Sequence, residues 1–414
     1  MELSPKGRKT EMTIIEFFDR ESAVENIAGS LLYSPERVVF TGSDSKRMKK
    51  CIENYKAVLE GRGINVDFEC RTVNRNNLGA ITETIESIVA QSGECGIDLS
   101  GGDEFFLVAA GRILEKYKEK IRIHRLSIRN NSMIDCDCDG NVCSSLPVAL
   151  SIDENIRIYG GRVIYEGEKS GTTCRWNLDS DFVSDIYAMW SICKKDVGLW
   201  NAQTNVIARL CNASPADYGL AVSAGISKEK NGPSFSEEIL VSLEKEGIIR
   251  NLRITDRISF EFKNKQVKKC LTKAGQLLEL VITVEAYEAK DENSNRIYND
   301  VSCGVYIDWD GIAGRDSRIE VKNEIDVILM KGITPVFISC KNGVVDSDEL
   351  YKLSVVAERF GGKYVRKILV ATQLDEMGYK AEYIRARAKD MDIKIIEDVD
   401  SANEKELRNL IAKL

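Results

Sequence analysis

A regular alternation of short β-rich runs with amphipathic helical segments, from Met12 to about Leu150, constrains the fold more than any other feature of the sequence. Parallel strands need long crossover connections, which are usually helices, so this order is typical of a parallel sheet covered by helices. The chain is therefore expected to be an α/β protein. The expected strands are Met12–Phe18, Arg37–Thr41, Asn65–Cys70, Cys95–Leu99 and Ile121–Ser127, and the expected helices are Ala23–Leu32, Ser45–Arg62, Leu78–Gln91 and Glu104–Tyr117.

Small residues follow two of these strands at the positions where the chain turns into a helix. The carboxyl ends of parallel strands lie at one edge of the sheet, where open α/β sheets bind ligands. Small residues let backbone N–H groups approach a phosphate closely, and the helix beginning near Glu104 offers its N-terminal end to an anion. The residues concerned are Gly42, Ser43, Ser100, Gly101 and Gly102. No GxGxxG is present, so a dinucleotide cofactor is not expected, and the alternative is that these glycines only make tight turns.

The length of 414 residues suggests two or three domains at about 150 residues each. We expect a sensor-like first region over 1–150, a connector over 151–265 and a last domain over 266–414. The polar first residues, the twelve cysteines without a CxxC pair and the lack of a long apolar run predict a cytoplasmic protein that has no disulfide framework and no membrane contact. The net charge of −7 gives no general indication of nucleic-acid binding.

The connector is expected to begin with a polar β segment, Val148–Ile164, and to continue with helical sequence over Leu178–Asn212. A helix at Ser236–Gly247 followed by two strands, Ile248–Ile254 and Arg257–Phe262, looks like a small winged-helix element. The stretch Ser223–Ser234 is rich in Gly, Ser and Lys and is expected to be a flexible loop.

The last domain carries the residues best suited to chemistry. Two antiparallel strands joined by a short turn at Lys331–Ile333 should bring Asp326 close to Lys341, and a helix could direct Glu279 at the same point. Carboxylates are hard ligands for Mg²⁺ or Mn²⁺, and a lysine stabilises developing phosphate charge. The alternative is a structural ion pair at the end of a hairpin. The expected elements are the helix Val267–Glu288, the strands Val301–Asp308, Asn323–Met330 and Thr334–Cys340, the helix Ser347–Phe360, the strand Val365–Ala371, the helix Tyr379–Lys389 and the strand Asp392–Glu397.

This order of elements, with Glu324-Ile-Asp326 and the strand-terminal Lys341, resembles the PD-(D/E)XK nuclease superfamily over 266–414. The resemblance implies a metal-dependent nuclease with Glu279, Asp326 and Lys341 as catalytic residues, of which Glu279 and Asp326 hold Mn²⁺ or Mg²⁺. The superfamily usually has a carboxylate or amide two residues before the lysine, where this chain has Ser339. Glu279 or Glu324 would supply the missing carboxylate, and the number of metal ions stays open.

The first region resembles a CARF domain, the Rossmann-like sensor of cyclic oligoadenylates in CRISPR defence. The matching features are the strand-to-loop transitions at Asp19–Ser22, Thr41–Asp44 and Asp98–Asp103. The resemblance adds Asp19, Ser22 and Thr41 to the candidate ligand residues.

A CARF sensor joined through a winged-helix-like element to a PD-(D/E)XK domain resembles the CRISPR ancillary nucleases that cyclic tetra-adenylate activates. This family implies a homodimer that binds one cyclic ligand across its two sensors and cleaves DNA, single-stranded RNA or both in type III antiviral defence. Ring size and the choice between DNA and RNA stay open. The rival hypothesis is a ligand-responsive transcriptional regulator, in which Ser236–Phe262 binds DNA and the last domain is inactive.

Other motifs are given structural interpretations. Asp135–Gly140 begins like a calcium loop but has Leu146 at the twelfth position, so a hairpin turn at Asp139-Gly140 is favoured over a calcium or cysteine-zinc site. The single histidine, His124, lies in a β-rich run and is interpreted as structural. Asp308 and Asp310 either belong to the metal site or are surface carboxylates in a turn, which is the commoner case. Arg315 and Arg318 either contact a phosphate or lie in a solvated loop.

Overall fold

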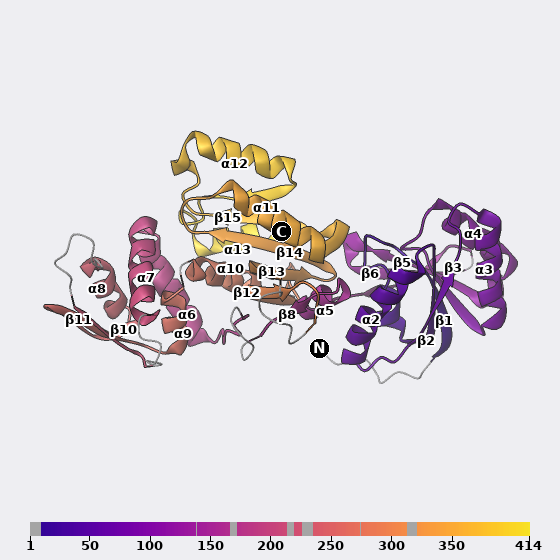
Figure 1. The fold of residues 1–414 in the computed structure, drawn as a ribbon, viewed down its shortest axis with the longest axis horizontal. Helices are drawn as coiled ribbons and strands as arrows, with labels where there is room; N and C mark the ends of the chain where they lie inside the picture. Colours follow the sequence, from indigo (N-terminus) through magenta and orange to yellow (C-terminus); the bar gives the residue numbers. More distant parts are fainter. Residues whose placement is uncertain are drawn as a thin grey trace.

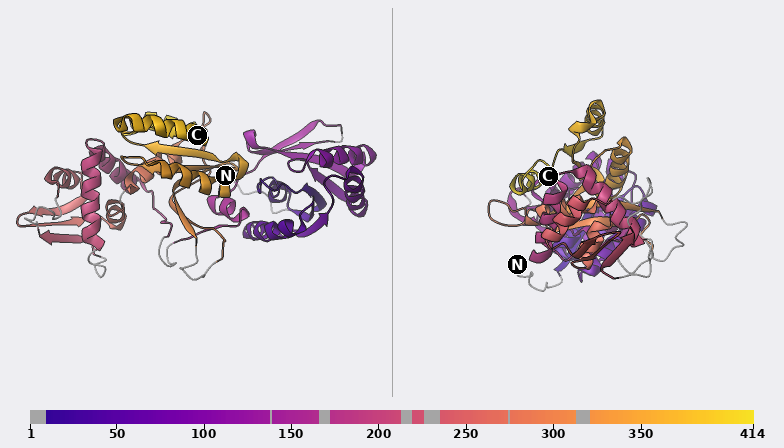
Figure 2. Two further views of the ribbon diagram at one scale, coloured as in Figure 1. Left: turned by 45° about the horizontal axis from the view of Figure 1, so that its top comes forward. Right: turned by 90° about the vertical axis from the view of Figure 1, so that its left-hand side faces the viewer.

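The computed structural model describes residues 10–137, 139–165, 172–212, 219–225, 235–273, 275–312 and 321–414. These residues form an elongated molecule of three regions in a row, which Figure 1 shows along its length and Figure 2 from two further directions. The N-terminal α/β region lies at one end, the C-terminal sheet lies in the centre, and the helical connector lies at the other end. None of the described helices combines the length and the apolar character that crossing a lipid bilayer requires.

The N-terminal region contains a seven-stranded sheet in the order β3-β2-β1-β4-β5-β6-β7. Strands β1 to β5 pair in parallel, and β6 and β7 continue the sheet as an antiparallel hairpin. The predicted parallel sheet is therefore confirmed, and it is extended by two strands. The strands are β1 (Thr10–Phe17), β2 (Pro35–Gly42), β3 (Asp67–Thr72), β4 (Glu94–Asp98), β5 (Ile121–Ser127), β6 (Ser132–Cys136) and β7 (Val142–Pro147).

Helices cover both faces of this sheet because its strands present apolar side chains on both sides. Ile15, Phe17 and Val39 pack against α3 and α4, whereas Ile14, Val38 and Phe40 pack on the opposite face in the cluster that contains residues of α1 and α2. The helices are α1 (Ala28–Tyr33), α2 (Ser45–Gly61), α3 (Leu78–Gln91) and α4 (Glu104–Lys116). The helix predicted from Ala23 to Leu32 is wrong in its first half, where the chain makes turns before α1 begins.

The connector begins with a helix where the sequence analysis expects a β segment. Helix α5 (Ile152–Ile158) interrupts Val148–Ile164 and starts with a capping box between Ser151 and Glu154. The strand that follows, β8 (Arg162–Val163), pairs with β12 at the edge of the C-terminal sheet. The predicted β segment is therefore reduced to two residues, and they lie in the sheet of the last domain.

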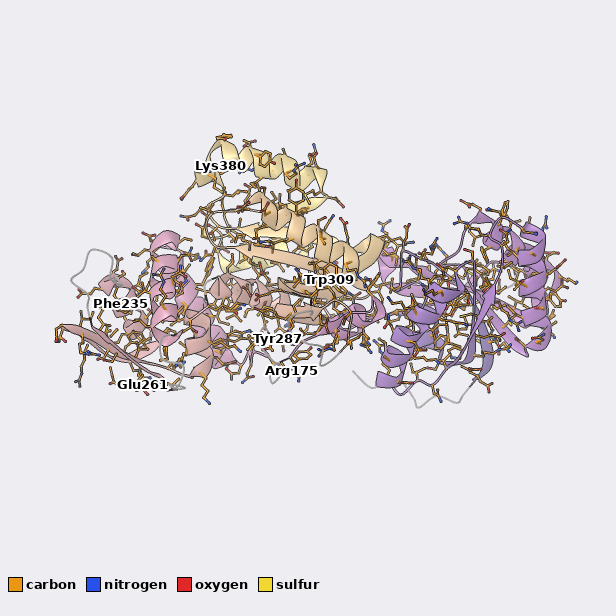
Figure 3. The ribbon with its side chains drawn as sticks, in the orientation of Figure 1. Arg175, Phe235, Glu261, Tyr287, Trp309 and Lys380 are labelled. Carbon is orange, nitrogen blue, oxygen red and sulfur yellow. The ribbon has the colours of Figure 1, made fainter. Side chains whose placement is uncertain are left out.

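The rest of the connector combines a three-stranded sheet, in the order β10-β11-β9, with four helices. The predicted helix followed by two strands is confirmed as α8 (Glu237–Lys245), β10 (Ile249–Ile254) and β11 (Arg257–Phe262). Of the predicted loop Ser223–Ser234, Ser223 to Gly225 belong to a strand and the remainder lies outside the described residues. Phe235 and Glu261 mark this end of the molecule in Figure 3. The other elements are α6 (Ser180–Cys193), α7 (Val197–Asn212), β9 (Ala221–Gly225) and α9 (Lys265–Leu271).

The central sheet has the order β16-β15-β14-β13-β12-β8. Its antiparallel strands β12, β13 and β14 are followed by β15 and β16, which run parallel to β14. The predicted strands are confirmed, but the single helix expected over Val267–Glu288 is wrong, because Thr272–Gly275 separates α9 from α10. The elements are α10 (Gln276–Glu288), β12 (Asp300–Asp308), β13 (Lys322–Lys331), β14 (Thr334–Lys341), α11 (Ser347–Gly361), β15 (Arg366–Ala371), α12 (Tyr379–Asp390), β16 (Ile393–Ile396) and α13 (Glu404–Ala412). Single-turn 3₁₀ helices lie at Lys118–Lys120, Ile128–Asn130, Gly362–Tyr364 and Asp375–Met377.

The N-terminal region and the central sheet share one continuous apolar core that includes residues of both. At its rim, Arg62, which directly follows α2, donates two hydrogen bonds of 2.6 Å to the carboxylate of Glu154 on α5. Tyr364, in the 3₁₀ turn after α11, donates a 2.6 Å hydrogen bond to the carboxylate of Glu25 in the N-terminal region. The two regions are therefore held together by packing as well as by polar contacts.

Candidate functional site

Strands β13 and β14 bring Asp326 and Lys341 together, as the predicted hairpin requires. The pairing of Val327 with Ile338 places Asp326 beside Ser339. The Oδ2 atom of Asp326 accepts hydrogen bonds of 2.7 Å from the backbone N–H of Cys340 and 3.1 Å from the hydroxyl of Ser339. The Nζ atom of Lys341 lies 3.8 Å from the same oxygen. Ser339, two residues before Lys341, thus helps to hold Asp326.

Lys341 has a second and closer partner, Glu349 in the first turn of α11. Its Nζ lies 2.8 Å from Glu349 Oε2, so the lysine is paired more tightly with α11 than with Asp326. Burial opposes the charged form of Lys341, but Asp326 and the hydrogen bond to Glu349 outweigh it and raise its pKa. The lysine is therefore a fixed positive charge. Sequence reasoning missed Glu349, because a helix-start glutamate is indistinguishable from a capping residue.

Two glutamates converge beside Gly304 on β12. A Cβ at Gly304 would lie 3.7 Å from Glu279 Oε2, 3.8 Å from Glu324 Oε1 and 3.6 Å from Lys273 Nζ. Gly304 has a φ of +58°, in the left-handed region that favours glycine. Glycine therefore suits both the backbone of β12 and the close approach of the two carboxylates.

The two glutamates have different partners. Glu324 forms an ion pair with Lys273 through Oε1 and accepts a 2.6 Å hydrogen bond from the Tyr306 hydroxyl through Oε2. Glu279 accepts a 2.9 Å hydrogen bond through Oε2 from Gln276. Both oxygens of Glu324 are therefore engaged, which favours Glu279 as the extra metal ligand. Lys273 and Tyr306 were missed by sequence reasoning; the break between α9 and α10, which positions Lys273, was hidden by continuous helical periodicity.

Burial dominates the electrostatics of the carboxylates. It raises the pKa of Glu279 to about 8; Lys273 opposes this rise, and the negative charges of Asp326 and Glu324 add to it. Burial also raises the pKa of Asp326, against the lowering effects of Lys341 and of the hydrogen bonds from Cys340 and Ser339. Several carboxylates in one buried place favour a bound cation, because a cation compensates their mutual repulsion.

The oxygens of Glu279, Glu324 and Asp326 are not all within 4.8 Å of one another. The donor set is of the hard oxygen type that suits Mg²⁺ or Mn²⁺. The residues present fit such an ion in kind, and their side chains must draw closer to hold it.

Asp308 lies 3.5 Å from Arg162 and accepts a 3.4 Å hydrogen bond from the backbone N–H of Asp310. Asp308 and Asp310 therefore stabilise the end of β12. Arg315 and Arg318 lie outside the described residues.

A second candidate site lies at the carboxyl edge of the N-terminal sheet. A cavity of about 210 Å³ opens there between the loops that follow β1, β2 and β4. Of the predicted ligand residues, Asp19, Gly42, Ser43 and Gly102 line it. Two arginines that the sequence did not indicate, Arg20 and Arg75, also line the cavity. Arg20 forms an ion pair with Asp44 at 3.4 Å, and Arg75 forms one with Asp103 at 3.1 Å.

The remaining predicted ligand residues support these loops from within. Ser22 and Thr41 are buried, and the Thr41 hydroxyl donates to the carbonyl of Glu16 at 3.3 Å. The hydroxyl of Ser100 accepts a 2.6 Å hydrogen bond from the backbone of Leu126. Gly101 is buried, and any side chain there would overlap the carbonyl oxygen of Phe17.

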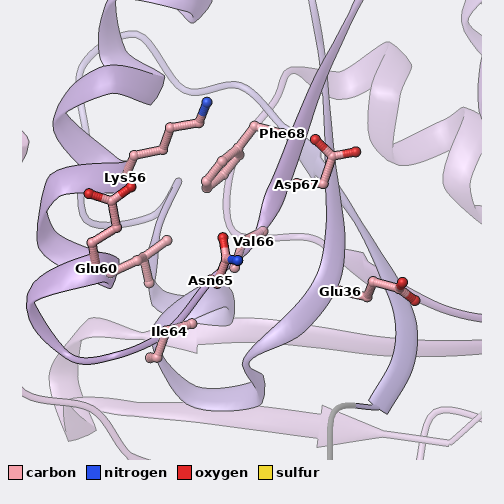
Figure 4. A pocket seen from close by; sticks show the side chains of 9 residues that line it. Glu36, Lys56, Glu60, Ile64, Asn65, Val66, Asp67 and Phe68 are labelled. Carbon is pink, nitrogen blue, oxygen red and sulfur yellow. The ribbon is translucent and has the colours of Figure 1, made fainter.

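A further cavity of about 400 Å³ lies between α2 and the start of β3, at the amino edge of the sheet (Figure 4). It is lined by Glu36, Glu60 and Asp67 and by Lys56, so negative charge predominates. It lies at the amino ends of β2 and β3, so it is not assigned to the ligand expected at the carboxyl edge. The Asp139-Gly140 segment is a hairpin turn as predicted, with Asp137 accepting backbone hydrogen bonds from Asp139 and Asn141.

Comparisons with known proteins agree with this geometry. Residues 272–413 match the family model described as the endonuclease domain of Card1-like proteins. Among solved structures, the chain is similar to protein VC1899 from Vibrio cholerae, with 19% identity, 97% of both chains covered and a TM-score of 0.74. It is also similar to Can2 from Sulfobacillus thermosulfidooxidans, solved in complex with cyclic tetra-adenylate, with 15% identity, 97% of this chain and 99% of that chain covered and a TM-score of 0.64.

No sequence among the curated proteins matches the chain. The family match confirms the predicted endonuclease domain, and the structural matches extend the similarity of fold over nearly the whole chain. The predicted endonuclease domain and the overall fold therefore agree with the comparisons.

Replacing Lys341 or Asp326 by alanine should reduce cleavage by about 10²- to 10³-fold, because each removes charge stabilisation at the reacting phosphate or a metal ligand. Rates on labelled DNA and RNA measure this effect. Glu279→Gln should have a comparable effect and Glu324→Gln a smaller one. Wild-type rates in the Lys341 and Asp326 variants would show that the two residues are only a structural ion pair.

The raised pKa of Glu279 predicts a pH-dependent stability. Its pKa is about 8 in the folded chain, above the unfolded value, so its contribution to stability is present at low pH and is lost as the pH rises through about 8. Glu279→Gln should therefore stabilise the protein in EDTA by an amount that grows from about pH 4.5 to about pH 8 and then stays constant, on the order of a few kcal/mol. Denaturant unfolding in EDTA across this range measures the effect. Glu288→Gln, an exposed position on the same helix, is the matched control, and equal pH profiles for both variants would contradict the assignment.

Proposed function

We propose that this protein is a metal-dependent endonuclease of type III CRISPR defence that cyclic tetra-adenylate activates. The observation that carries the proposal is the convergence of Asp326 and Lys341 at the end of the β13–β14 hairpin, inside the region that matches a Card1-like endonuclease domain. We assign residues 266–414 to a PD-(D/E)XK-type nuclease, 1–150 to a CARF sensor and 151–265 to a winged-helix-like connector. The substrate is DNA, single-stranded RNA or both.

The chemistry is assigned to three side chains. Glu279 and Asp326 would hold Mn²⁺ or Mg²⁺, which supplies an activated water and stabilises charge on the phosphate. Lys341 is a permanent cation beside Asp326 and stabilises the developing phosphate charge. Glu349 lies 2.8 Å from the same lysine, and we assign release of the Lys341–Glu349 pair to activation.

The activator is assigned to the loop cavity of the N-terminal sheet. Arg20 and Arg75 supply positive charge, and Ser43 and Gly102 leave room for a phosphate. Cyclic tetra-adenylate has two-fold symmetry, which a two-fold homodimer matches most simply, with each chain offering the same edge to half of the ring. The structure of Can2 with cyclic tetra-adenylate, which has a similar fold, supports this choice of ligand.

A chain of contacts connects the two sites. Lys363, in the 3₁₀ turn after α11, lies 3.1 Å from Asp19 in the ligand loop and 2.8 Å from Glu25. Helix α11 ends just before this lysine and carries Glu349 in its first turn. A ligand that displaces Asp19 would therefore act on the same helix that holds Lys341.

A transcriptional regulator remains the alternative. Its supporting observation is the exposed arginines of the connector hairpin, Arg250, Arg253 and Arg257. The first turn of α8, however, carries Glu237 and Glu238, which repel a phosphate backbone. Together with the surviving nuclease residues, this charge favours the enzyme.

Lys363→Ala should uncouple the two sites. Cleavage stimulated by cyclic tetra-adenylate, relative to unstimulated cleavage, should change by about tenfold, because a coupling energy of about 1–3 kcal/mol is typical. Calorimetry on the same variant separates ligand affinity from coupling. Lys380→Ala, at an exposed position on α12, is the control. An unchanged stimulation ratio in Lys363→Ala would show that coupling takes another route.

The activator and the metal are tested together. Cleavage of supercoiled plasmid and of labelled RNA should require Mn²⁺ or Mg²⁺, should stop in EDTA, and should respond to cyclic tetra-adenylate more than to the tri- and hexa-adenylate rings. Calorimetry should give one ligand per two chains. Because Gly101 is packed against β1, Ser43→Trp is the better variant for blocking the ligand. One ligand per chain, or full cleavage without any ligand, would contradict the sensor assignment.

A further inference from the structure

Three ionisable side chains form a row across the centre of the N-terminal sheet, outside both sites described above. Glu16 on β1 pairs in register with Asp98 on β4, which pairs in register with His124 on β5. Parallel neighbours in register project to the same face of a sheet. All three are buried, with 1%, 0% and 3% of their surfaces exposed, respectively. Buried groups of this kind are normally hydrogen-bonded or bound to a metal.

The row has three unsatisfied atoms that meet at one point. Glu16 Oε1, Asp98 Oδ2 and His124 Nε2 are buried without a hydrogen-bond partner. They lie within 4.8 Å of one another, and the His124 and Asp98 atoms are 3.4 Å apart. Ligand atoms at about 2.1 Å from a zinc ion lie about 3.4 Å apart at the tetrahedral angle. The spacing of the imidazole and the carboxylate is thus that of two neighbouring ligands.

Two glycines leave space for this arrangement. A Cβ at Gly29 on α1 would lie 3.1 Å from Glu16 Oε1, 3.2 Å from His124 Nε2 and 3.3 Å from Asp98 Oδ2. A Cβ at Gly96 would lie 2.8 Å from Cε1 of the imidazole. Gly96 therefore lets the ring lie over β4, and Gly29 leaves the space in front of the three atoms free.

We propose that Glu16, Asp98 and His124 bind a divalent transition-metal ion of the Zn²⁺ type inside the sensor domain, with its remaining coordination position directed toward Gly29. The donor set favours this class, because imidazole suits Zn²⁺ and its neighbours, whereas Mg²⁺ prefers oxygen ligands and retains its waters. The structural role predicted for His124 thereby becomes more specific.

The position of the site gives it a structural task. The other oxygen of Asp98, Oδ1, accepts a 2.7 Å hydrogen bond from the backbone of Ser100 at the start of the ligand loop. A metal bound to Asp98 would fix the side chain that holds this loop. The site would hold β1, β4 and β5 together at their carboxyl ends.

The test measures metal content and needs no activity assay. The parent protein for this test carries Glu279→Gln and Asp326→Asn. These substitutions remove the proposed metal ligands of the central site, so any metal that the parent still binds is assigned to the N-terminal site. After chelation and reloading with Zn²⁺ or Co²⁺, we expect about one ion per parent chain by mass spectrometry, with a raised melting temperature. The Co²⁺ form should show visible bands without the intense near-ultraviolet absorption of a thiolate complex, which excludes the twelve cysteines.

Two variants of this parent locate the ion. His124→Ala should lose the metal. Gly29→Ala keeps all three ligands but places a methyl group where the ion and its open position lie, so it should also lose the metal, although alanine suits a helix better than glycine. Tyr33→Phe is the control, because the ring of Tyr33 lies beside His124, with centroids 5.0 Å apart, but provides no ligand. This variant should retain the ion.

If His124→Ala fails to fold, Gly29→Ala and the thermal shift of the parent decide the question. A parent that binds neither Zn²⁺ nor Co²⁺ would overturn the proposal and leave a buried proton-sharing cluster. Metal binding that persists unchanged in both His124→Ala and Gly29→Ala would overturn it as well, since the ion would then lie elsewhere.

Discussion

The pairing of β13 with β14 is the interaction on which both the geometry of the candidate site and the contact with the N-terminal region depend. One end of this hairpin holds Asp326 beside the end of β14, where the N–H of Cys340 donates to it. The other end is the turn at Gly332, whose φ is +63° and whose missing side chain leaves room for Asn131 of the N-terminal region. The backbone of Ile333 donates to the Asn131 side chain at 3.2 Å, and Leu150 donates to the carbonyl of Gly332 at 3.0 Å. A shift in register would therefore disturb the site and the sensor contact at once.

The central site sets carboxylates against lysines, and the lysines compensate the carboxylate charge only in part. Lys273 and Lys341 each neutralise part of the carboxylate charge, through Glu324 and through Asp326 together with Glu349. The high pKa of Glu279 shows that this compensation is insufficient, because burial still favours its neutral form. A metal ion would have to displace the proton of Glu279, so the affinity for metal and the packing around α10 are linked.

The sequence was sufficient for features that depend on local periodicity. The alternation of strands and helices predicts the parallel sheet, and the short turn at Lys331–Ile333 predicts the proximity of Asp326 and Lys341. Features that depend on distant contacts were not predictable. Nothing local separates α9 from α10 except Gly275, whose φ is +81°, and that break positions Lys273.

Register between parallel strands is the clearest limit. Glu16, Asp98 and His124 are far apart in the sequence, and a slip of one residue would point any of them to the other face. In contrast, Ser151 and Glu154 have the spacing of a capping box and indicate the start of α5. This signal was missed because the surrounding segment was predicted to be a β strand. Local signals thus predicted which elements form, and packing decided which side chains meet.

The sensor edge and the interdomain contact use the same kind of interaction, partly exposed ion pairs that can exchange partners. Arg20 and Arg75 are paired with Asp44 and Asp103, and about half of each arginine side chain is exposed, at 51% and 53%. Such pairs contribute only about 0–1 kcal/mol each, so a phosphate can replace the carboxylates at small cost. Asp19 lies in the same cavity and is held by Lys363 of the central region. In the proposed function, an anion bound in this cavity would attract the arginines and repel Asp19. This opposition would give the ligand different affinities for two arrangements of the loop, which is the physical requirement for activation at a distance.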